Sequence, residues 1–314
     1  MEVLMLGQAE VRQLLDPDAL FEALSAEFIG LTRGQCVAPP RNEVQVPAGF
    51  LLGMPAWRQG QPISVKLVSV FHQNHHVGLP GHLALMCLFD PDTGLPLAVM
   101  DGTHITAFRT AAAAALSVRL LARPEVRVLA ILGAGVQGRE HLALVPRVRE
   151  FAEVRVSSMY AADAERLARE DPRARAAASP EEAVRDADVV CLCTTAAEPV
   201  IDAGWLLPGA HVTSVGYMPP AGEIPSALVH QARLFVETRL AFEPPPVGCA
   251  ELQGMDPALG TELGEVLLDS SRGRQRDDEV TLYKAMGHAA EDMAAAALVL
   301  RRASAAGIGR MVTL

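Results

Sequence analysis

The sequence predicts an α/β protein in which a doubly wound parallel sheet follows a domain of antiparallel strands. An apolar strand runs directly into a glycine-rich turn and a helix at residues 126–142. From residue 153 onward, short apolar strands alternate with helical segments, which is typical of a parallel sheet with helices on both faces. Before the glycine turn, strand-like runs follow one another with turns between them, as in antiparallel sheets.

The composition is that of a folded globular chain. Its length of 314 residues is enough for two domains and a substantial core. Because 50% of the residues are hydrophobic and only 20% are charged, the chain is expected to fold. The net charge of −10 argues against a nucleic-acid partner or an anionic membrane partner, but it allows a local cationic pocket. We see no signal peptide and no uncharged apolar run near ~18 residues, and the five cysteines contain no CxxC motif. A cytoplasmic protein with reduced thiols is therefore expected.

The N-terminal part is expected to combine one helix with a series of strands. Asp16 and Pro17 are typical of an N-cap and a first helical position, and the helix they open is expected to reach Ile29. The residues 90–94, DPDTG, are typical of a hairpin turn. Strands are expected at residues 3–6, 42–46, 49–55, 63–71, 83–89 and 96–100.

Lys66 is unusual because it interrupts the β-prone run 63–71. Such a lysine either lies on an exposed face or points into a polar cavity. Ser64 and Val68 would share its face, so that face is not uniformly polar. If Lys66 is buried, it needs an anionic partner.

Residues 72–82, HQNHHVGLPGH, contain four histidines. A zinc site needs ligands of fixed geometry, and no Cys or carboxylate pattern supports one in this segment. We therefore expect no metal and interpret the segment as a polar loop over a pocket.

A helix is expected over about residues 105–122, and the first domain is expected to end near residue 122. Arg109 lies in the first turns of this helix, where a cation costs up to about 1 kcal/mol. The placement makes sense if Arg109 and the free backbone N–H groups bind one anion together. The alternative is a solvated arginine.

The glycine turn has the spacing GxGxxG, formed by Gly133, Gly135 and Gly138. The first glycine allows a tight turn, the second lets the backbone approach a pyrophosphate, and the third lets the helix pack against the sheet. The helix that follows would direct its N–H groups and its positive dipole end at the phosphates. The pattern predicts a dinucleotide site, with a plain strand–turn–helix as the alternative.

The remaining chain is expected to complete the parallel sheet. Strands are expected at residues 153–158, 187–193, 210–215 and 234–237, with a closing strand at 309–314. Helices are expected at about residues 164–170, 180–186, 261–268 and 277–303. Ligands bind at the carboxyl ends of parallel strands, which directs attention to the loops at 133–138, 158–159, 194–195 and 216–220. The second strand ends in SSMY (157–160) without an acid, which leaves NAD or NADP open with a slight preference for NADP.

Six motifs together resemble a known family. They are PPRNEV (39–44), SVKLVSVF (64–71), LFDPDTGLPLAVMDGTHITAFRTAAAAALS (88–117), LGAGVQG (132–138), SVGYMPP (214–220) and TLYKAMG (281–287). On these motifs the chain resembles the ornithine cyclodeaminase/mu-crystallin family over nearly its whole length. The pattern directly ahead of the glycine turn is far more specific than the glycine turn itself.

The resemblance implies a homodimer with two domains in each chain. Residues 1–122 with 285–314 would bind substrate and form the dimer, and residues 123–284 would be a Rossmann domain that binds NAD(P). By resemblance, Arg41 and Lys66 hold the α-carboxylate of an amino or imino acid, Lys66 is also catalytic, and Arg109 lies near substrate and pyrophosphate. The implied cofactor-binding residues are Arg109, Thr110, Gly133, Gly135, Val136, Gln137, Gly138, Ser158, Thr194, Val215, Gly216 and Met218.

One departure bears on the reaction. Cyclodeaminases of the family carry a proton-transferring aspartate where this chain has Met218, and a lysine where it has Gly222. Methionine cannot transfer a proton. We therefore expect an NAD(P)H-dependent oxidoreductase of a small α-imino or α-amino acid, such as pyrroline- or piperideine-2-carboxylate. Glu223, His82 and Tyr217 are further candidate proton carriers. The alternatives are an ammonia lyase of cyclodeaminase type acting on a diamino acid, and a non-catalytic protein that binds NADP and a ligand as mu-crystallin-like members do.

Overall fold

The computed structural model describes residues 1–314, apart from the side chains of His72 and His75. The chain divides into two compact units. Unit 1 comprises Met1–Arg109 with His288–Leu314, and unit 2 comprises Thr110–Gly287. The division falls inside helix α3 (Gly102–Leu121), whereas the sequence suggested a boundary at the end of that helix.

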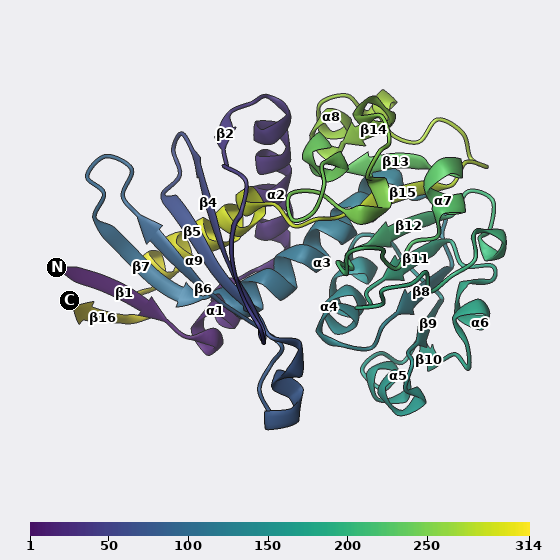
Figure 1. Cartoon of the computed structure of the whole chain (residues 1–314), viewed down its shortest axis with the longest axis horizontal. Helices are drawn as coiled ribbons and strands as arrows, with labels where there is room; N and C mark the ends of the chain where they lie inside the picture. The colour runs from purple at the N-terminus through teal and green to yellow at the C-terminus, as the bar shows by residue number, and fades with distance from the viewer. The chain divides into compact units, whose positions relative to one another are not determined.

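Unit 1 contains a sheet in the order β16-β1-β7-β6-β5-β4-β2, with β3 also paired to β4. The pairs are antiparallel except for β1 with β7. The N- and C-terminal strands are neighbours, so the two ends of the chain lie side by side (Figure 1). The strands are β1 (Glu2–Leu6), β2 (Cys36–Val37), β3 (Asn42–Val46), β4 (Gly49–Arg58), β5 (Ile63–Val70), β6 (His82–Phe89), β7 (Pro96–Asp101) and β16 (Arg310–Thr313). The predicted antiparallel strands are confirmed.

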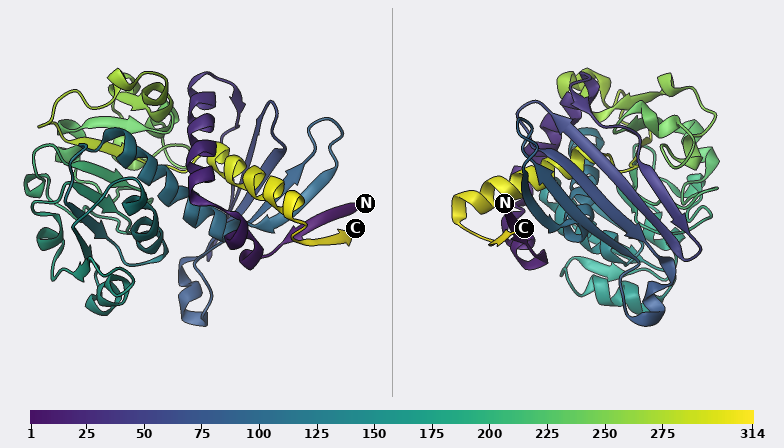
Figure 2. Two further views of the ribbon diagram at one scale, coloured as in Figure 1. Left: turned by 180° about the vertical axis from the view of Figure 1, so that it is seen from behind. Right: turned by 60° about the vertical axis from the view of Figure 1, so that its left-hand side comes forward.

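Helices cover one face of this sheet. They are α1 (Gln8–Leu14), α2 (Pro17–Thr32) and α9 (Ala289–Ala306). The side chain of Asp16 accepts a hydrogen bond from the Ala19 N–H, so the predicted helix start is confirmed. Figure 2 shows α2 and α9 over the same face, and α9 contacts both β4 and β5. The inner face is mainly apolar, and Met293 of α9 packs in its core cluster.

The opposite face of the same sheet exposes apolar side chains. Leu67 on β5 pairs with Leu85 on β6, and Leu83 pairs with Ser69. Leu51, Leu67, Leu83 and Leu85 are exposed by 43%, 37%, 38% and 52%, which is unusual for leucines that lie together on one sheet. We call these four residues the leucine face.

Unit 2 contains a second sheet, in the order β10-β9-β8-β11-β12-β15-β13-β14. Its pairs are parallel, as predicted. The strands are β8 (Val128–Leu132), β9 (Glu153–Ser157), β10 (Ala174–Ala176), β11 (Val189–Leu192), β12 (His211–Ser214), β13 (Arg233–Val236), β14 (Gly260–Glu262) and β15 (Thr281–Lys284). Besides α3, the α-helices of this unit are α4 (Val136–Leu144), α5 (Ala161–Ala168), α6 (Pro180–Val184), α7 (Ser226–Gln231) and α8 (Leu263–Leu268).

Short 3₁₀ helices occur mainly in the connections of unit 2. They are η1 (His72–Val77) in unit 1, and η2 (Val145–Arg147), η3 (Ala203–Trp205), η4 (Arg239–Phe242), η5 (Ala250–Leu252), η6 (Pro257–Leu259) and η7 (Ser270–Arg272) in unit 2. Among the helices of the described residues, none combines the length and hydropathy needed to cross a membrane.

The predicted helix over residues 277–303 is wrong at its N-terminal end. Residues Thr281–Lys284 form β15, which is fully buried between β12 and β13. A β-branched residue, a leucine and a tyrosine fit such a buried strand better than the start of a helix. Gly287, at φ 74°, then reverses the backbone before α9 begins at Ala289.

Candidate active site

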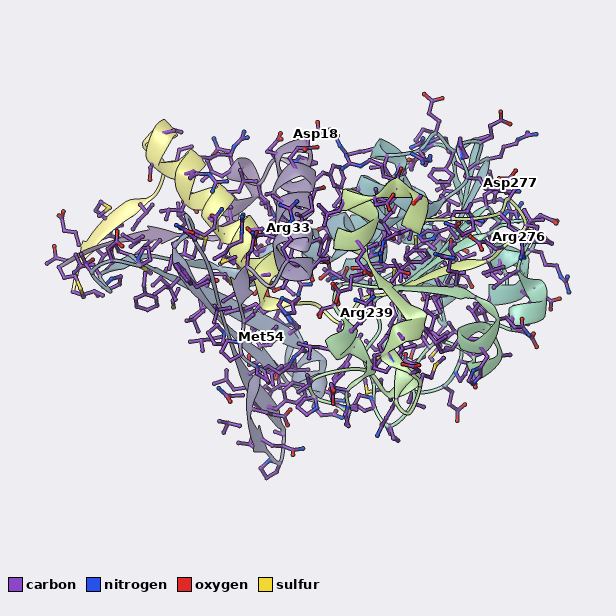
Figure 3. All side chains as sticks on the ribbon, turned by 90° about the horizontal axis from the view of Figure 1, so that it is seen from above. Asp18, Arg33, Met54, Arg239, Arg276 and Asp277 are labelled. Carbon is purple, nitrogen blue, oxygen red and sulfur yellow. The ribbon has the colours of Figure 1, made fainter. Side chains whose placement is uncertain are left out.

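Lys66 lies on the inner face of the unit 1 sheet. It stands in register with Met54 on β4 and Met86 on β6, and the three are 2%, 5% and 0% exposed. Figure 3 labels Met54 among the side chains drawn on the ribbon. The Lys66 Nζ lies 2.6 Å from Oδ2 of Asp292 on α9. Lys66 is therefore buried and does not lie on an exposed face, and Asp292 is the anionic partner that its burial requires.

Arg109 reaches the same carboxylate from α3. Its Nε donates to Asp292 Oδ1 at 2.9 Å, and its Nη1 donates to Glu291 Oε2 at 3.1 Å. Because α3 begins at Gly102 and not near residue 105, Arg109 lies beyond the first turn of the helix. Arg109 therefore lies further from the free N–H groups of the helix start than the sequence suggested. Its charge is met by two carboxylates of α9.

The sequence around residue 288 explains why two acids gather here. His288 caps α9 by accepting a hydrogen bond from the Ala290 N–H, while Glu291 Oε1 accepts one from the His288 N–H at 2.7 Å. This reciprocal arrangement is a capping box. It sets Glu291 and Asp292 in the first turn, where the helix dipole favours negative charge.

Burial and charge set the protonation states of this cluster. Burial, with help from Arg109 and Arg41, lowers the pKa of Lys66 to about 8 although Asp292 opposes the shift. Burial raises the pKa of Asp292, but Arg109 and Lys66 lower it more, so it stays below its usual value and the group is a carboxylate. Burial and the nearby cations lower the pKa of His82 and of His288 to about 4, so both imidazoles are neutral at pH 7.

The structure therefore brings the three predicted substrate residues into one electrostatic cluster within unit 1. Arg41 acts on both Lys66 and His288. Two cations paired with a buried carboxylate, with Arg41 acting on the same cluster beside neutral imidazoles, can hold the carboxylate of a small ligand. An ammonium whose pKa lies near neutrality can also exchange a proton.

The glycine turn of unit 2 has the geometry that a dinucleotide requires. Gly133 lies at φ 103°, and a Cβ there would come within 2.5 Å of the Cys193 carbonyl oxygen. A Cβ at Gly138 would lie 1.9 Å from the Gly133 oxygen. A Cβ built on Gly135, in contrast, meets no heavy atom of the described residues within 4 Å. Two glycines are therefore needed for the fold, while the third leaves open space where a pyrophosphate would approach.

Helix α4 directs its start into that space. It begins at Val136 with Gly135 as N-cap, and the described side chains provide no hydrogen bond to the cap. Its first N–H groups and its dipole can thus serve an anion. These residues fit a dinucleotide cofactor.

Most other predicted cofactor residues of unit 2 lie at the same carboxyl edge of its sheet. Ser158 follows β9, Thr194 follows β11, and Val215 and Gly216 follow β12. Val136 and Gln137 open α4. Met218 lies further along the loop after β12, in an isolated bridge with Ala221. Thr110 is buried in α3, and Arg109 belongs to unit 1.

Sequence reasoning missed the acidic half of the unit 1 cluster. Asp292, Glu291 and His288 were read as part of one long helix. The motif H-x-x-E directly after a glycine was the available signal, because it marks a helix start with a capping box.

The remaining candidate proton carriers differ in their environments. Glu223 is fully buried, and its carboxylate accepts hydrogen bonds from Thr194, Ser214 and Gly216. His82 is neutral, and Tyr217 is partly buried in the loop after β12.

The histidine-rich segment folds as η1, and two of its side chains, those of His72 and His75, lie outside the described residues. Among the side chains that the structure does describe, no group of three or more His, Cys, Asp and Glu residues could hold a metal ion.

Comparison with known proteins places these features in context. The sequence model of the ornithine cyclodeaminase/mu-crystallin family matches residues 1–307. The mouse (Mus musculus) ketimine reductase mu-crystallin is 38% identical over 283 residues, which cover 88% of this chain and 89% of that protein.

Two solved structures share the fold. The Delta(1)-pyrroline-2-carboxylate reductase of Thermococcus litoralis, in complex with NADH and L-proline, has a TM-score of 0.92 and 32% identity, covering 98% of this chain and 99% of that one. An archaeal alanine dehydrogenase dimer with bound NAD has a TM-score of 0.88 and 29% identity, and the match covers 100% of each chain.

Proposed function

Because the chain belongs to the ornithine cyclodeaminase/mu-crystallin family, we propose that it is an NAD(P)H-dependent oxidoreductase of a small α-imino or α-amino acid. The bond that reacts is the C=N bond of an imine or the CH–NH bond of the corresponding amine. Cyclic ketimines such as pyrroline- or piperideine-2-carboxylate are the substrates we favour. Relatives with ketimine, pyrroline-2-carboxylate and alanine as substrates support this choice.

The observation that carries the proposal is the buried Lys66, which lies on the mainly apolar inner face of the unit 1 sheet with its Nζ 2.6 Å from Asp292 Oδ2 on α9. Burying an ammonium between two methionines is costly, and an apolar residue would serve the fold better. A functional reason for the lysine is an α-carboxylate ligand. In our proposal Arg41 and Lys66 bind that carboxylate by charge-assisted hydrogen bonds, and Arg109 keeps the site cationic.

Proton transfer is the second role of Lys66. Reduction of the C=N bond requires a hydride at carbon and a proton at nitrogen; NAD(P)H, when bound, supplies the hydride. The Lys66 ammonium, with its pKa lowered to about 8, gives the proton to the nitrogen and becomes a neutral amine. Asp292 fixes the position of Nζ throughout. Met218 cannot donate a proton, and the Glu223 carboxylate already accepts hydrogen bonds from Thr194, Ser214 and Gly216.

The cofactor is proposed to bind at the carboxyl edge of the unit 2 sheet. The open space at Gly135 and the start of α4 would receive the pyrophosphate. The proposed cofactor residues are Arg109, Thr110, Gly133, Gly135, Val136, Gln137, Gly138, Ser158, Thr194, Val215, Gly216 and Met218. Since no acid follows β9, repulsion of a 2′-phosphate is absent, and we propose that NADP is accepted as well as NAD.

We further propose a homodimer located in the cytoplasm. The leucine face supports an interface with a second copy, as does the dimeric state of the archaeal alanine dehydrogenase. Five free cysteines fit a reducing compartment. The net charge of −10 gives no support for a nucleic-acid or membrane partner.

The test is an assay of the purified protein with NADH or NADPH and a panel of cyclic imino acids. We expect oxidation of the cofactor in proportion to the amino acid formed, and loss of that activity in Lys66→Met. Incubation with ornithine and other diamino acids distinguishes a cyclodeaminase, which would release ammonia without net cofactor oxidation. Tight binding of cofactor and imino acid with no turnover would instead identify a binding protein. Either result would refute the proposed function.

A further inference from the structure

Glu223 joins the ends of two neighbouring strands of unit 2. Its Oε2 accepts hydrogen bonds from the backbone N–H of Thr194 at 2.8 Å and from the Thr194 hydroxyl at 2.7 Å. Its Oε1 accepts from the Ser214 hydroxyl at 2.8 Å and from the Gly216 N–H at 2.7 Å. Thr194 follows β11, and Ser214 and Gly216 lie at the end of β12. One side chain therefore ties both strand ends together.

The carboxylate is saturated by these contacts. An ionised carboxylate has about four acceptor positions, and four donors occupy them. The side chain is also 0% exposed. Such a group has no lone pair left for a substrate proton, so its role differs from the proton carrier that the sequence suggested.

Gly216 is held from both sides. While Glu223 binds its N–H, the Lys284 Nζ donates to its carbonyl oxygen at 2.6 Å and to the Ser214 hydroxyl at 3.2 Å. A Cβ on residue 216 would lie 2.6 Å from the Glu223 carboxyl carbon, so only glycine fits beneath the carboxylate. Lys284 is in turn paired with Glu251 at 3.0 Å.

The same network explains Gly222. A Cβ at that position would come within 2.0 Å of Glu251 Oε1, so the carboxylate that pairs with Lys284 fills the space. The loop between Gly216 and Glu223 is thus held at both ends. Lys284, which pairs with Glu251, holds the Gly216 end, and the hydrogen bonds of the Glu223 carboxylate hold the other end. Buried polar networks of this kind rigidify a segment when every member is satisfied.

We propose that Glu223 is a positioning residue, which fixes Thr194 and Gly216 at the carboxyl edge of the sheet in the geometry that the dinucleotide needs. This inference rests on the proposed function only in taking NAD(P) as the ligand of that edge. It predicts that loss of the carboxylate loosens both strand ends before any cofactor is added, and that weaker cofactor binding follows.

The test compares Glu223→Gln with Asp188→Asn in the full-length protein. Asp188 is the matched control, because it is a nearly buried carboxylate of the same unit that accepts from the N–H groups of Arg127 at 2.7 Å and Val128 at 3.0 Å. Those bonds lie at the amino edge of the sheet, away from the proposed cofactor edge. In Glu223→Gln an NH₂ group replaces one carboxylate oxygen, so a hydrogen-bond donor faces the donors that this oxygen had accepted from. Ser214→Ala, which removes a single bond to Glu223, is a milder second variant.

Two readouts separate positioning from general stability. Hydrogen exchange in the cofactor-free protein should accelerate at Thr194 and Gly216 in Glu223→Gln, but not in Asp188→Asn. The dissociation constant of NADH, followed by fluorescence, should rise about ten- to a hundredfold in Glu223→Gln, less in Ser214→Ala, and less than about twofold in Asp188→Asn. The pH profile of turnover should keep its shape in Glu223→Gln, because no catalytic proton is lost.

Unchanged exchange at Thr194 and Gly216 would overturn the inference, as would NADH affinity in Glu223→Gln equal to that of the wild type. Loss of one limb of the pH profile would instead identify Glu223 as a proton carrier and also overturn it. If wild-type protein fails to bind NADH or NADPH while exchange still accelerates in Glu223→Gln, the cofactor assignment fails and the fixing of the strand ends is supported.

Discussion

Replacing Lys66 by methionine should abolish activity while stabilising the protein. The fall in the Lys66 pKa from 10.5 to about 8 corresponds to about 3 kcal/mol against the charged amine, at 1.36 kcal/mol per unit. Asp292 keeps Arg109 as a partner at 2.9 Å, and the new side chain would join Met54 and Met86 in the same row of the sheet. We therefore expect Lys66→Met to raise the free energy of unfolding by up to about 3 kcal/mol at pH 7.

The pH dependence gives this prediction its sign. The folded pKa lies below the unfolded one, so the penalty on the wild type is complete below pH 8 and fades as the pH rises toward 10.5. The advantage of the variant should fade over the same range. Unfolding of unit 1 can be followed in urea by Trp57 fluorescence in a Trp205→Phe background, since the chain has 2 tryptophans.

Lys284→Met is the control for Lys66→Met. It removes the donor to Glu251 and to the Gly216 carbonyl and should destabilise unit 2, which is followed by Trp205 fluorescence in a Trp57→Phe background. If Lys66→Met is less stable than the wild type at pH 7, or if it retains imine reduction, the reasoning about Lys66 is refuted.

Three further sets of variants test the proton donor, the cofactor turn and the dimer interface. Reduction by the wild type should slow above pH about 8, as Lys66 loses its proton. Asp292→Asn should move this alkaline limb of the pH–rate profile to lower pH, because Asp292 raises the Lys66 pKa. The same variant should lower the free energy of unfolding by about 3–5 kcal/mol. An unmoved limb in the pH–rate profile would exclude Lys66 as the donor. Gly135→Ala should keep the melting temperature yet weaken NADH binding at least about tenfold, whereas Gly133→Ala should lower the melting temperature because of its φ of 103°; equal behaviour of the two variants would contradict the pyrophosphate assignment. Leu67→Asp with Leu85→Asp should yield a monomer in analytical ultracentrifugation, and a dimer that persists would exclude the leucine face as the interface.

The sequence was most informative where a residue contradicted its surroundings. Lys66 in a β-prone run and a glycine pattern between a strand and a helix both marked positions whose side chains or backbone had to serve more than packing. For the glycine turn, its spacing between a strand and a helix carried the prediction of a dinucleotide site. For Lys66 the local pattern left exposure and burial open, and the ligand role came from the family resemblance. The parallel sheet of unit 2 followed equally well from strand–helix alternation.

The partners of these residues could not be predicted, because they come from distant parts of the chain. Asp292 meets Lys66 and Arg109 only after α9 has returned to the first sheet. The return of the C-terminal segment to the first domain was expected, but a helix assumed to start at Asp277 puts the capping box of α9 in its interior, so the two acids in the first turn of α9 were not assigned to the site. The two carboxylates that pair with Arg109 were therefore not predicted.

Hydride transfer is tested most directly by following deuterium into the product from NADH or NADPH that carries two deuterium atoms at the nicotinamide C4. With a cyclic imino acid as substrate, the account predicts deuterium on the carbon that bears the carboxylate, one atom for each cofactor oxidised, and none in the Lys66→Met variant. Product formed without deuterium at that carbon, or formed while the dideuterated cofactor stays reduced, would contradict hydride transfer to a carboxylate-bearing imine.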